Sequence, residues 1–417
     1  MENLNKVGLI DDVKKVSGYF NDLYGESTEK QLERYEKNFK WFKESFNKTS
    51  CYVASSSGRV EVCGNHTDHQ GGKVVSCAIS LDTISMFLPT DDGIIKLKSE
   101  GYSDIVIDTN GDTPVKNGTS AAIVKGVVEG LKNKGYKAGG FVACCTSNVL
   151  NGAGISSSAS FECLIAKILS FLYNNNEVST EDIAKISQYS ENVYFGKPCG
   201  LLDQTAIAYG GIKQLDFYDK NRIGVKEIES SLEGYTLILI DTGSDHANLT
   251  DEYASIPAEM FAVAKYLGKE RLSDVCEKDF YKNIKELRKF VGDRPVLRSI
   301  HYFEEMKRVE LLTTALNGGD YEIFLECIRK SGDSSYKFLQ NCYVPKLGEQ
   351  AVPVALALSS EFLRGGANRI HGGGFAGTIL NIVKNENVKD FIADMKNFYD
   401  EKAIIVLKVR KYGAIVL

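Results

Sequence analysis

The sequence predicts an α+β protein built from two lobes. Between residues 52 and 108, short runs rich in β-branched and aromatic residues are punctuated by Gly, Asp and Pro, a pattern typical of strands joined by turns. Further along, the strand-like run YTLILIDT at 235–242 is followed by segments of helical periodicity to about Gly348. Because the texture changes between these parts and 417 residues exceed an ordinary single domain, we expect lobes of residues 1–210 and 211–417.

The predicted elements can be placed in order along the chain. The opening stretch to about Lys48 is predicted to be helical, because residues such as Phe20, Leu23 and Tyr24 recur at three-to-four spacing among charged ones. It would form a helical extension of the first lobe. The later elements follow in this order: the strand-rich stretch 52–108, a helix from Ala121, a strand at 140–146, a helix at 161–175, the strand at 235–242, helical segments, a Gly-rich loop at 372–377, a strand at 378–383, a helix and two closing strands.

Composition and charge exclude several classes of protein. The formal charge is -5 and there is no long basic stripe, so a nucleic-acid partner is not expected. No run approaches the roughly 20 apolar residues of a membrane span, and the N-terminus lacks an apolar signal segment. The 10 cysteines include no CxxC pair, which argues against a zinc ribbon or a disulfide scaffold. We therefore expect a cytoplasmic protein with reduced thiols and no membrane partner.

A loop of small residues is the most informative segment. It runs from Gly152 to Ser160 as GAGISSSAS, between a predicted strand and an amphipathic helix. Small residues let the backbone approach a ligand closely, and a helix N-terminus offers unpaired N–H groups and the positive end of a dipole, so the segment predicts a phosphate site. Its hydroxyls could also reach a magnesium ion. Alone, the same residues could form a Ser-rich N-cap turn, and no GK[ST] follows that would make them a Walker A motif.

A second segment, GRVEVCGNHTDHQGG at 58–72, follows a predicted strand with a dense cluster of hydrogen-bonding side chains. Each sugar hydroxyl is both donor and acceptor, so a sugar site needs such a cluster. His66, Asp68 and His69 could instead ligate a metal, although the chain has only five histidines and no further ligand stands at an obvious spacing. A turn whose polar groups satisfy one another is the remaining alternative.

Two more segments carry candidate groups. ENVYFGKPCGLLDQ at 191–204 places two acids, Glu191 and Asp203, around a turn marked by Gly and Pro. Phosphoryl transfer needs one carboxylate on magnesium and another facing the acceptor hydroxyl. Either acid alone would more often be a solvated or capping residue. HGGGFAG at 371–377 is a glycine run before a strand, and by itself it indicates only a loop that approaches another backbone or a ligand.

Together the four segments resemble the signatures of the galactokinases. Those signatures look like GRVNLIGEHTDYNGG, GxGLSSSASLE, CGIMDQ and GGGFGG, and they occur here in the same order at similar separations, from about residue 52 to the C-terminus. The resemblance implies the two-lobed GHMP kinase fold, with a ribosomal-S5-like N-terminal lobe, a ferredoxin-like C-terminal lobe and the active site in the cleft between them. It also implies an ATP-dependent sugar 1-kinase that converts galactose to galactose 1-phosphate, with Mg2+ as cofactor.

The resemblance also assigns roles to individual residues. Asp203 would act as the base or orienting acceptor at the sugar C1 hydroxyl, and Arg59 beside it would stabilise negative charge on the transferring phosphoryl group. Ser158 and Glu191 would lie at the magnesium ion. The sugar contacts would be Arg59, Asn65, His66, Asp68, Gly200, Asp203 and Tyr253. The loop around the ATP phosphates would consist of Gly152, Ala153, Gly154, Ile155, Ser156, Ser157, Ser158 and Ala159.

The chain departs from the family pattern at several positions. Asn65 stands where the family has Glu, so a 6-carboxylate on the sugar would not meet a like charge, and galacturonate is therefore an alternative substrate. Ser120 replaces a Trp near the adenine, which leaves the nucleotide preference open, and Ile256 and Pro257 replace an Arg pair. A sugar sensor that has lost phosphoryl transfer is a further alternative, against which the intact Ser-rich loop argues. Apart from the sugar and ATP no partner is expected, and the protein is expected to be a monomer.

Overall fold

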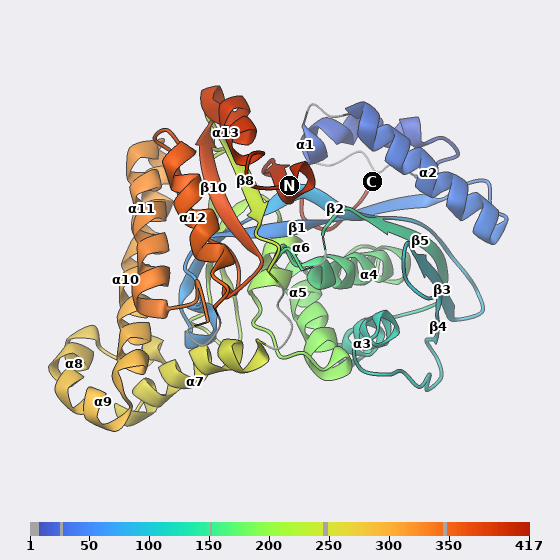
Figure 1. The fold of residues 1–417 in the computed structure, drawn as a ribbon. Coiled ribbons are helices and arrows are strands. Elements are labelled where there is room, and N and C mark those ends of the chain that lie inside the picture. The colour runs from blue at the N-terminus through green and yellow to red at the C-terminus, as the bar shows by residue number, and fades with distance from the viewer. Residues whose placement is uncertain (1–7, 26–27, 151, 245–248, 345–347) are drawn as a thin grey trace.

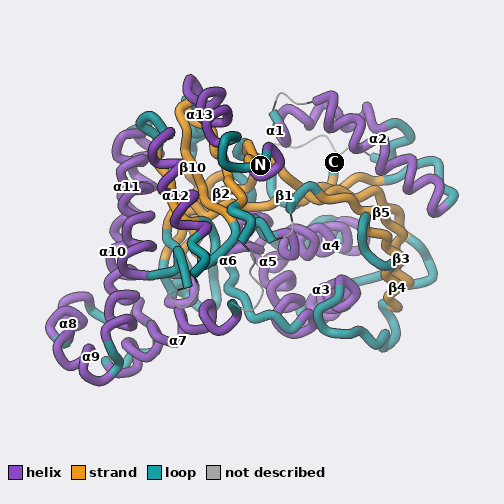
Figure 2. Tube along the Cα trace, in the orientation of Figure 1, coloured by secondary structure: helices purple, strands orange, loops and turns teal. Residues whose placement is uncertain are grey.

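Two β-sheets, each flanked by helices, organise the chain (Figure 1). The structure is a computed structural model that describes residues 8–25, 28–150, 152–244, 249–344 and 348–417. Figure 2 shows the strands in orange running through the middle of the molecule, with the helices in purple around them. The strands therefore form the scaffold from which the loops of the site project.

The first sheet is mixed and, within the described residues, has eight strands in the order β12-β1-β2-β5-β3-β4, with β6 on β2 and β7 on β6. Its strands are β1 (Tyr52–Cys63), β2 (Lys73–Pro89), β3 (Ile94–Ser99), β4 (Ile105–Asp108), β5 (Phe141–Ser147), β6 (Ile212–Asp216), β7 (Gly224–Ile228) and β12 (Ile415–Val416). Among the described strands, β3 and β5 are the one pair that runs in parallel. β2 is long enough to pair along one edge with β6 at its start and with β5 at its end.

Helices cover both faces of this sheet. They are α1 (Phe20–Tyr24) and α2 (Thr28–Phe46) on one face, and α3 (Ser120–Asn133), α4 (Ser157–Tyr173), α5 (Thr180–Tyr189) and α6 (Leu202–Tyr209) on the other. Because successive strand residues point to opposite sides, Val53 packs under the N-terminal helices and Ala54 under α4. The strands β1 and β5 are therefore buried almost throughout, which is why their sequences show no clear polar alternation.

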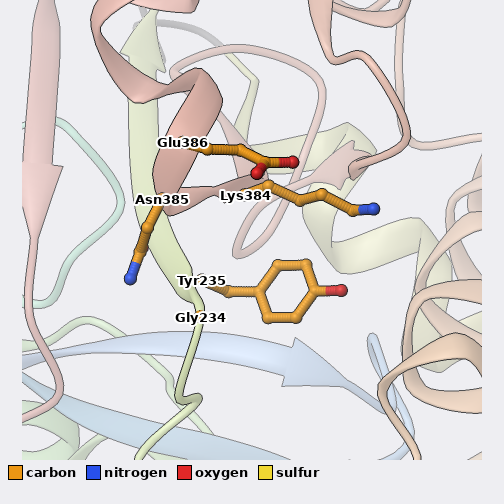
Figure 3. Close-up of a pocket in the computed structure, with 5 residues that line it drawn as sticks. All are labelled: Gly234, Tyr235, Lys384, Asn385 and Glu386. Carbon is orange, nitrogen blue, oxygen red and sulfur yellow. The ribbon is translucent and has the colours of Figure 1, made fainter.

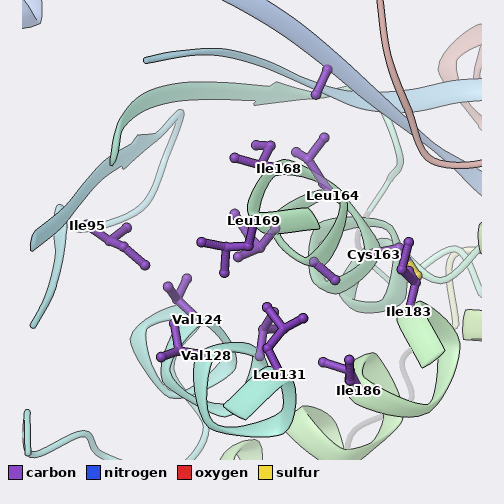
Figure 4. Packing of buried hydrophobic residues seen from close by; sticks show 14 of the residues in the cluster. Ile95, Val124, Val128, Leu131, Cys163, Leu164, Ile168, Leu169, Ile183 and Ile186 are labelled. Carbon is purple, nitrogen blue, oxygen red and sulfur yellow. The ribbon is translucent and has the colours of Figure 1, made fainter. Parts of the chain in front are cut away.

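The core between the sheet and α3 to α5 anchors the helix that follows the small-residue loop (Figure 4). Ile95 of β3, Val124 and Leu131 of α3, and Leu164 and Leu169 of α4 are all fully buried there. Each such side chain contributes about 1.5–3 kcal/mol on burial. Since α4 begins at Ser157, this core fixes the helical end of the loop.

The second sheet is antiparallel, with the strand order β11-β8-β10-β9. Its strands are β8 (Tyr235–Asp241), β9 (Ala367–Ile370), β10 (Thr378–Lys384) and β11 (Ile404–Leu407). Its helices are α7 (Thr250–Tyr266), α8 (Glu277–Lys282), α9 (Ile284–Phe290), α10 (Asp293–Gly318), α11 (Tyr321–Ser334), α12 (Ala351–Phe362) and α13 (Val388–Met395). Leu239 and Leu380 face α10 and α11, whereas Ile238 and Ile379 face α12 and α13. This sheet, too, is covered on both faces.

The predicted α+β fold class is confirmed, and the elements occur in the predicted order. One detail differs from the short strand-like runs expected between residues 52 and 108. Residues 52–63 form the single long strand β1, because an irregularity of register between Ser57 and Arg59 lets pairing with β2 continue. The division into residues 1–210 and 211–417 stays a prediction; β6 and β7 follow residue 210 and yet pair with the first sheet. No helix in the described part of the chain is both long and apolar enough to cross a membrane.

A buried carboxylate, Asp82, ties the N-terminal helices and the C-terminal tail to β2. Its Oδ1 accepts from Arg34 Nη1 of α2 at 2.7 Å, and its Oδ2 accepts from Arg410 Nη1 at 3.0 Å. Tyr24 and Ser55 also donate to Oδ2. Burial alone would raise the pKa of Asp82, but the charges of Arg34 and Arg410 hold it below its ordinary value.

We expect Asp82→Asn to lower the free energy of unfolding by about 3–5 kcal/mol, because Arg410 would stay buried without its counter-ion. Urea denaturation followed by circular dichroism measures the change. Since the pKa of Asp82 is lower in the folded chain, this contribution is present above about pH 4 and is lost as the pH falls through the depressed pKa. The control is Asp92→Asn, which removes an exposed pair with Lys96 and leaves an amide oxygen that can still accept from Thr90 and Ile94. Equal losses in the two variants would contradict the role of Asp82.

Candidate active site

The predicted phosphate loop lies between β5 and the N-terminus of α4. Ser156, the residue before α4, has a left-handed backbone with a φ of 64°. Its side chain does not cap the helix, because its Oγ donates instead to Asp203 Oδ2 at 2.5 Å. The first N–H groups of α4 therefore have no side-chain cap from this residue, which leaves them available to an anion.

Asp203 and Arg59 form an ion pair at the edge of this loop. Arg59 Nε and Nη2 lie 2.8 and 2.7 Å from Asp203 Oδ1, and Arg59 Nη1 donates to the carbonyl of Gly154. The Arg59 side chain is only 7% exposed, whereas that of Asp203 is 34% exposed. The pair thus joins β1, the loop and the first turn of α6, and it leaves the carboxylate accessible to a ligand.

Glu191 lies beside the loop and is held from two sides. Its Oε1 accepts from Ser158 Oγ at 3.0 Å, and its Oε2 accepts from Gln204 Nε2 at 2.8 Å. The same Gln204 nitrogen donates to Glu162 Oε2 at 3.1 Å. Burial raises the pKa of Glu162 well above its ordinary value, and the charge of Glu191 adds to the shift. Ser158 and Glu191, the two residues predicted to lie at the metal, are thus in contact with each other.

The pair formed by Ser158 and Glu191 suits a Mg2+ ion that is shared with a nucleotide. Mg2+ is usually bound through one or two carboxylates together with waters and substrate phosphates, rather than by a cage made only of protein. Among the residues that the structure describes, no three His, Cys, Asp or Glu side chains gather as a metal-ligating group, and His66, Asp68 and His69 do not form one. The residues present thus fit an ion that phosphates help to hold.

Asp68 and Gly200 face each other on the predicted sugar side of the site. A Cβ atom added at Gly200 would lie 2.1 Å from Asp68 Oδ2, so a larger residue there would displace the Asp68 carboxylate. Burial raises the pKa of Asp68 to about 6, and the charge of Asp203 adds to the shift. The negative charges of Asp68 and Asp203 therefore act on each other in the site.

His66 and Tyr253 both donate to the glycine-rich loop after β9. His66 Nε2 lies 2.8 Å from Gly373 O, and Tyr253 Oη lies 2.7 Å from Gly374 O. His66 must carry its proton on Nε2, because a carbonyl oxygen can only accept. Burial lowers the pKa of His66 to about 4, so the ring is neutral at pH 7. The loop therefore brings these two predicted sugar contacts together.

Asn65 is the predicted sugar contact that the structure places in the interior. Its side chain is fully buried. Its Nδ2 donates to Glu61 Oε1 at 2.9 Å and to Gly372 O at 2.7 Å, while its Oδ1 accepts from Asn341 Nδ2 at 2.7 Å. An amide nitrogen has two hydrogens, so neither is left for a substrate. The role of Asn65 as a sugar contact stays a prediction that this geometry does not support.

A buried ion pair beside Asn65 was not predicted from the sequence. Arg369 Nη2 lies 3.0 Å from Glu61 Oε1, and the two side chains are 0% and 4% exposed. The galactokinase signature quoted above has Asn at position 61 and Glu at position 65, so this chain carries the two residue types exchanged. That exchange is the signal in the sequence that could have indicated a contact between Glu61 and Asn65.

His371 links β1 to the phosphate loop, a role that the glycine run alone did not indicate. The backbone N–H of Glu61 donates to His371 Nε2 at 3.3 Å, so the ring proton is on Nδ1. Nδ1 in turn donates to Thr378 Oγ1 at 3.1 Å, and Thr378 donates to Ala153 O at 2.9 Å. These hydrogen bonds thereby hold β1, the glycine-rich loop with the start of β10, and the phosphate loop together.

An open hollow of about 410 Å³ lies away from these residues (Figure 3). It is lined by Gly234, Tyr235, Lys384, Asn385 and Glu386. Thr378, which contacts the phosphate loop, begins β10 and Lys384 ends it, so the hollow is about 20 Å distant at roughly 3.3 Å per residue. It forms no part of the candidate site.

Comparison with known proteins defines the class. The family model for the GHMP kinase N-terminal domain matches residues 122–211. Galactokinase from Lactococcus lactis, solved in complex with galactose, has a TM-score of 0.78 at 24% identity, with 91% of this chain and 98% of that chain covered. Mevalonate kinase from Methanococcus jannaschii has a TM-score of 0.61 at 17% identity, with 87% and 99% covered. The fold, together with the loop, ion pair and carboxylate described above, is that of a GHMP kinase.

Sequence relatives narrow this class. The model of the galactokinase galactose-binding signature matches residues 40–87. Galactokinase from Clostridium acetobutylicum is 30% identical over 370 residues, and that from Clostridium beijerinckii is 29% identical over 371 residues; each alignment covers 87% of this chain and 92% of the relative. The chain therefore belongs to the galactokinase family, as the four segments predict, and it is a sugar kinase.

Proposed function

We propose that the chain transfers the γ-phosphoryl group of ATP to the C1 hydroxyl of galactose, giving galactose 1-phosphate and ADP. The observation that carries the proposal is the Asp203 carboxylate, which Arg59 and Ser156 hold at the N-terminus of α4 and which stays partly exposed. The carboxylate of Asp203, which can accept a hydrogen bond, thereby lies next to the cation of Arg59 and to the helix end that would bind phosphate. Galactose is proposed because the relatives and the structural neighbour are named for it.

The two oxygens of Asp203 have different parts in this reaction. Oδ1 accepts from two nitrogens of Arg59, whereas Oδ2 accepts from Ser156. Oδ2 keeps a free lone pair, so it would receive the hydrogen bond of the sugar hydroxyl and then its proton, as the hydroxyl oxygen bonds to the γ-phosphorus and the bond to ADP breaks. Arg59, bound to the same carboxylate, would stabilise charge on the phosphoryl oxygens.

The nucleotide phosphates would lie along residues 152–159, over the N–H groups at the start of α4. Ser158 and Glu191 would hold the Mg2+ that accompanies the nucleotide. When bound, that ion would neutralise negative charge on the nucleotide phosphates. Asp68, Gly200, His66 and Tyr253 would surround the sugar: Asp68 and Gly200 face each other, and His66 and Tyr253 both donate to the glycine-rich loop.

Galacturonate is the alternative substrate that Asn65 suggested. Its support is weaker here, because the donors of the Asn65 amide are used by Glu61 and Gly372 instead of pointing to a ligand. A silent sugar sensor is likewise less supported, since Arg59, Asp203 and the loop form one continuous set of contacts. We also propose that the protein is cytoplasmic and monomeric. Gel filtration tests the oligomeric state.

Initial rates of ATP consumption with Mg2+ test the function. The panel holds galactose, galacturonate, N-acetylgalactosamine, arabinose and glucose. We expect galactose to give the highest kcat/KM. A preference for galacturonate would overturn the proposed substrate, and the absence of turnover with every sugar would overturn the proposed kinase activity in favour of a sensor.

A further inference from the structure

Three acidic residues lie on the phosphate side of the proposed site, each with a different set of partners. Glu162 of α4 is fully buried, Glu191 is nearly so, and Asp203 is partly exposed. Asp203 has Arg59 as its counter-ion. Glu191 has a longer ion pair with Lys197, whose Nζ lies 3.6 Å from Glu191 Oε1. The Lys197 side chain is 67% exposed. Glu162 and Glu191 instead share one neutral donor, the side-chain amide of Gln204.

Gln204 is fully buried and follows Asp203 in the first turn of α6. Its Nε2 carries two hydrogens, and it lies 2.8 Å from Glu191 Oε2 and 3.1 Å from Glu162 Oε2. Its third contact, with Cys199 Sγ at 3.7 Å, is longer, so one hydrogen goes to each carboxylate. Because Oε2 of Glu191 is held from this side, its Oε1 is turned toward Ser158 and the phosphate loop.

We propose that Gln204 is a positioning residue for the metal site. It fixes Glu191 through Oε2 so that Oε1 is presented to the ion bound with the nucleotide, and it sets that carboxylate at a constant place relative to the neighbouring Asp203. The inference rests on the proposed magnesium site at Ser158 and Glu191. Loss of the hydrogen bond that orients a metal ligand commonly weakens metal affinity by about 10–100-fold.

Gln204→Met tests the proposal, because methionine keeps the length of the side chain and removes both hydrogen bonds. Isothermal titration calorimetry gives the Kd of the non-hydrolysable analogue AMPPNP with Mg2+ and with EDTA, and the ratio of the two measures what the metal contributes. We expect this ratio to fall about tenfold in Gln204→Met. The Kd of galactose should stay unchanged, since Gln204 does not touch the sugar in this arrangement.

Gln214→Met is the matched control. Gln214 is also buried, and its Nε2 donates to a carboxylate oxygen, Glu310 Oε1, at 3.0 Å, but it lies on β6 away from the loop. Its AMPPNP ratio should equal that of the wild type. Should Gln204→Met fail to fold, Gln204→Asn withdraws the amide by one methylene and gives the same comparison.

The outcomes separate this inference from the function on which it rests. If Glu191→Gln leaves the AMPPNP ratio of the wild type unchanged, the proposed metal site itself is wrong. If Glu191→Gln lowers the ratio but Gln204→Met does not, only the role of Gln204 is overturned. An equal loss of AMPPNP and galactose affinity in Gln204→Met, with or without Mg2+, would also overturn it, because that is the signature of a general packing defect.

Discussion

Replacing Asp203 with asparagine is expected to lower kcat by about 10²–10⁴-fold while leaving the affinity for galactose nearly unchanged. An asparagine can keep an acceptor oxygen toward Arg59, where Oδ1 receives two nitrogens. The group in place of Oδ2 then becomes an NH2 donor, which cannot accept the proton of a sugar hydroxyl. Steady-state kinetics give kcat, and calorimetry with galactose alone gives the affinity.

Asp68→Asn is the companion variant that separates binding from chemistry. Asp68 lies against Gly200 on the proposed sugar side of the site. We expect it mainly to raise KM for the sugar, with a smaller effect on kcat than Asp203→Asn. Normal turnover by Asp203→Asn would remove Asp203 from the reaction, whatever the behaviour of Asp68.

The second large effect is expected at Asn65, on stability more than on substrate choice. Asn65→Glu would replace two buried donors with a carboxylate directly beside Glu61 Oε1, which lies 2.9 Å from Asn65 Nδ2. Burying a second charge against the first, where Arg369 already forms an ion pair with Glu61, is expected to cost about 3–5 kcal/mol of the free energy of unfolding. Urea denaturation measures this cost, and rates with galactose and galacturonate measure the preference.

The double variant Glu61→Asn with Asn65→Glu provides the control. It restores one amide and one carboxylate, in the arrangement that the galactokinase signature carries. Asn65 Nδ2 and Arg369 Nη2 both donate to Glu61 Oε1, so a carboxylate at position 65 would still lie near Arg369. We therefore expect it to recover most of the stability that Asn65→Glu loses, which a double-mutant cycle records as a coupling energy. A stable Asn65→Glu protein with an altered ratio of galactose to galacturonate turnover would instead mean that Asn65 faces the sugar.

The fold class was predictable because its signals are local. The turn residues between 52 and 108 and the periodicity of the helices α4 and α10 are readable within windows of a few residues. The membership of β6 and β7 in the first sheet was not readable in this way. β7 pairs with the nearby β6, but β6 joins the sheet through β2, more than a hundred residues away in the chain. A local pattern predicts a strand but does not choose its neighbour.

The candidate site, like the fold, was predictable only in its local features. By itself the sequence determined which segments carry the chemistry: a small-residue loop before a helix, two acids around a turn, and a polar cluster after a strand, because each depends on the residue types in one short stretch. It also placed the chain in its family. Even the pair formed by Arg59 and Asp203, 144 positions apart, was available through that resemblance.

Only the tertiary structure decided where the individual hydrogen bonds go. Asn65 turns inward because Asn341, 276 positions away, and the carbonyl of Gly372 complete its amide, and a polar side chain looks the same in a sequence whether its partner is protein or ligand. Gln204 holds Glu191 and Glu162 for the same reason: one amide nitrogen can satisfy two carboxylates only where two other elements of the fold deliver them to it.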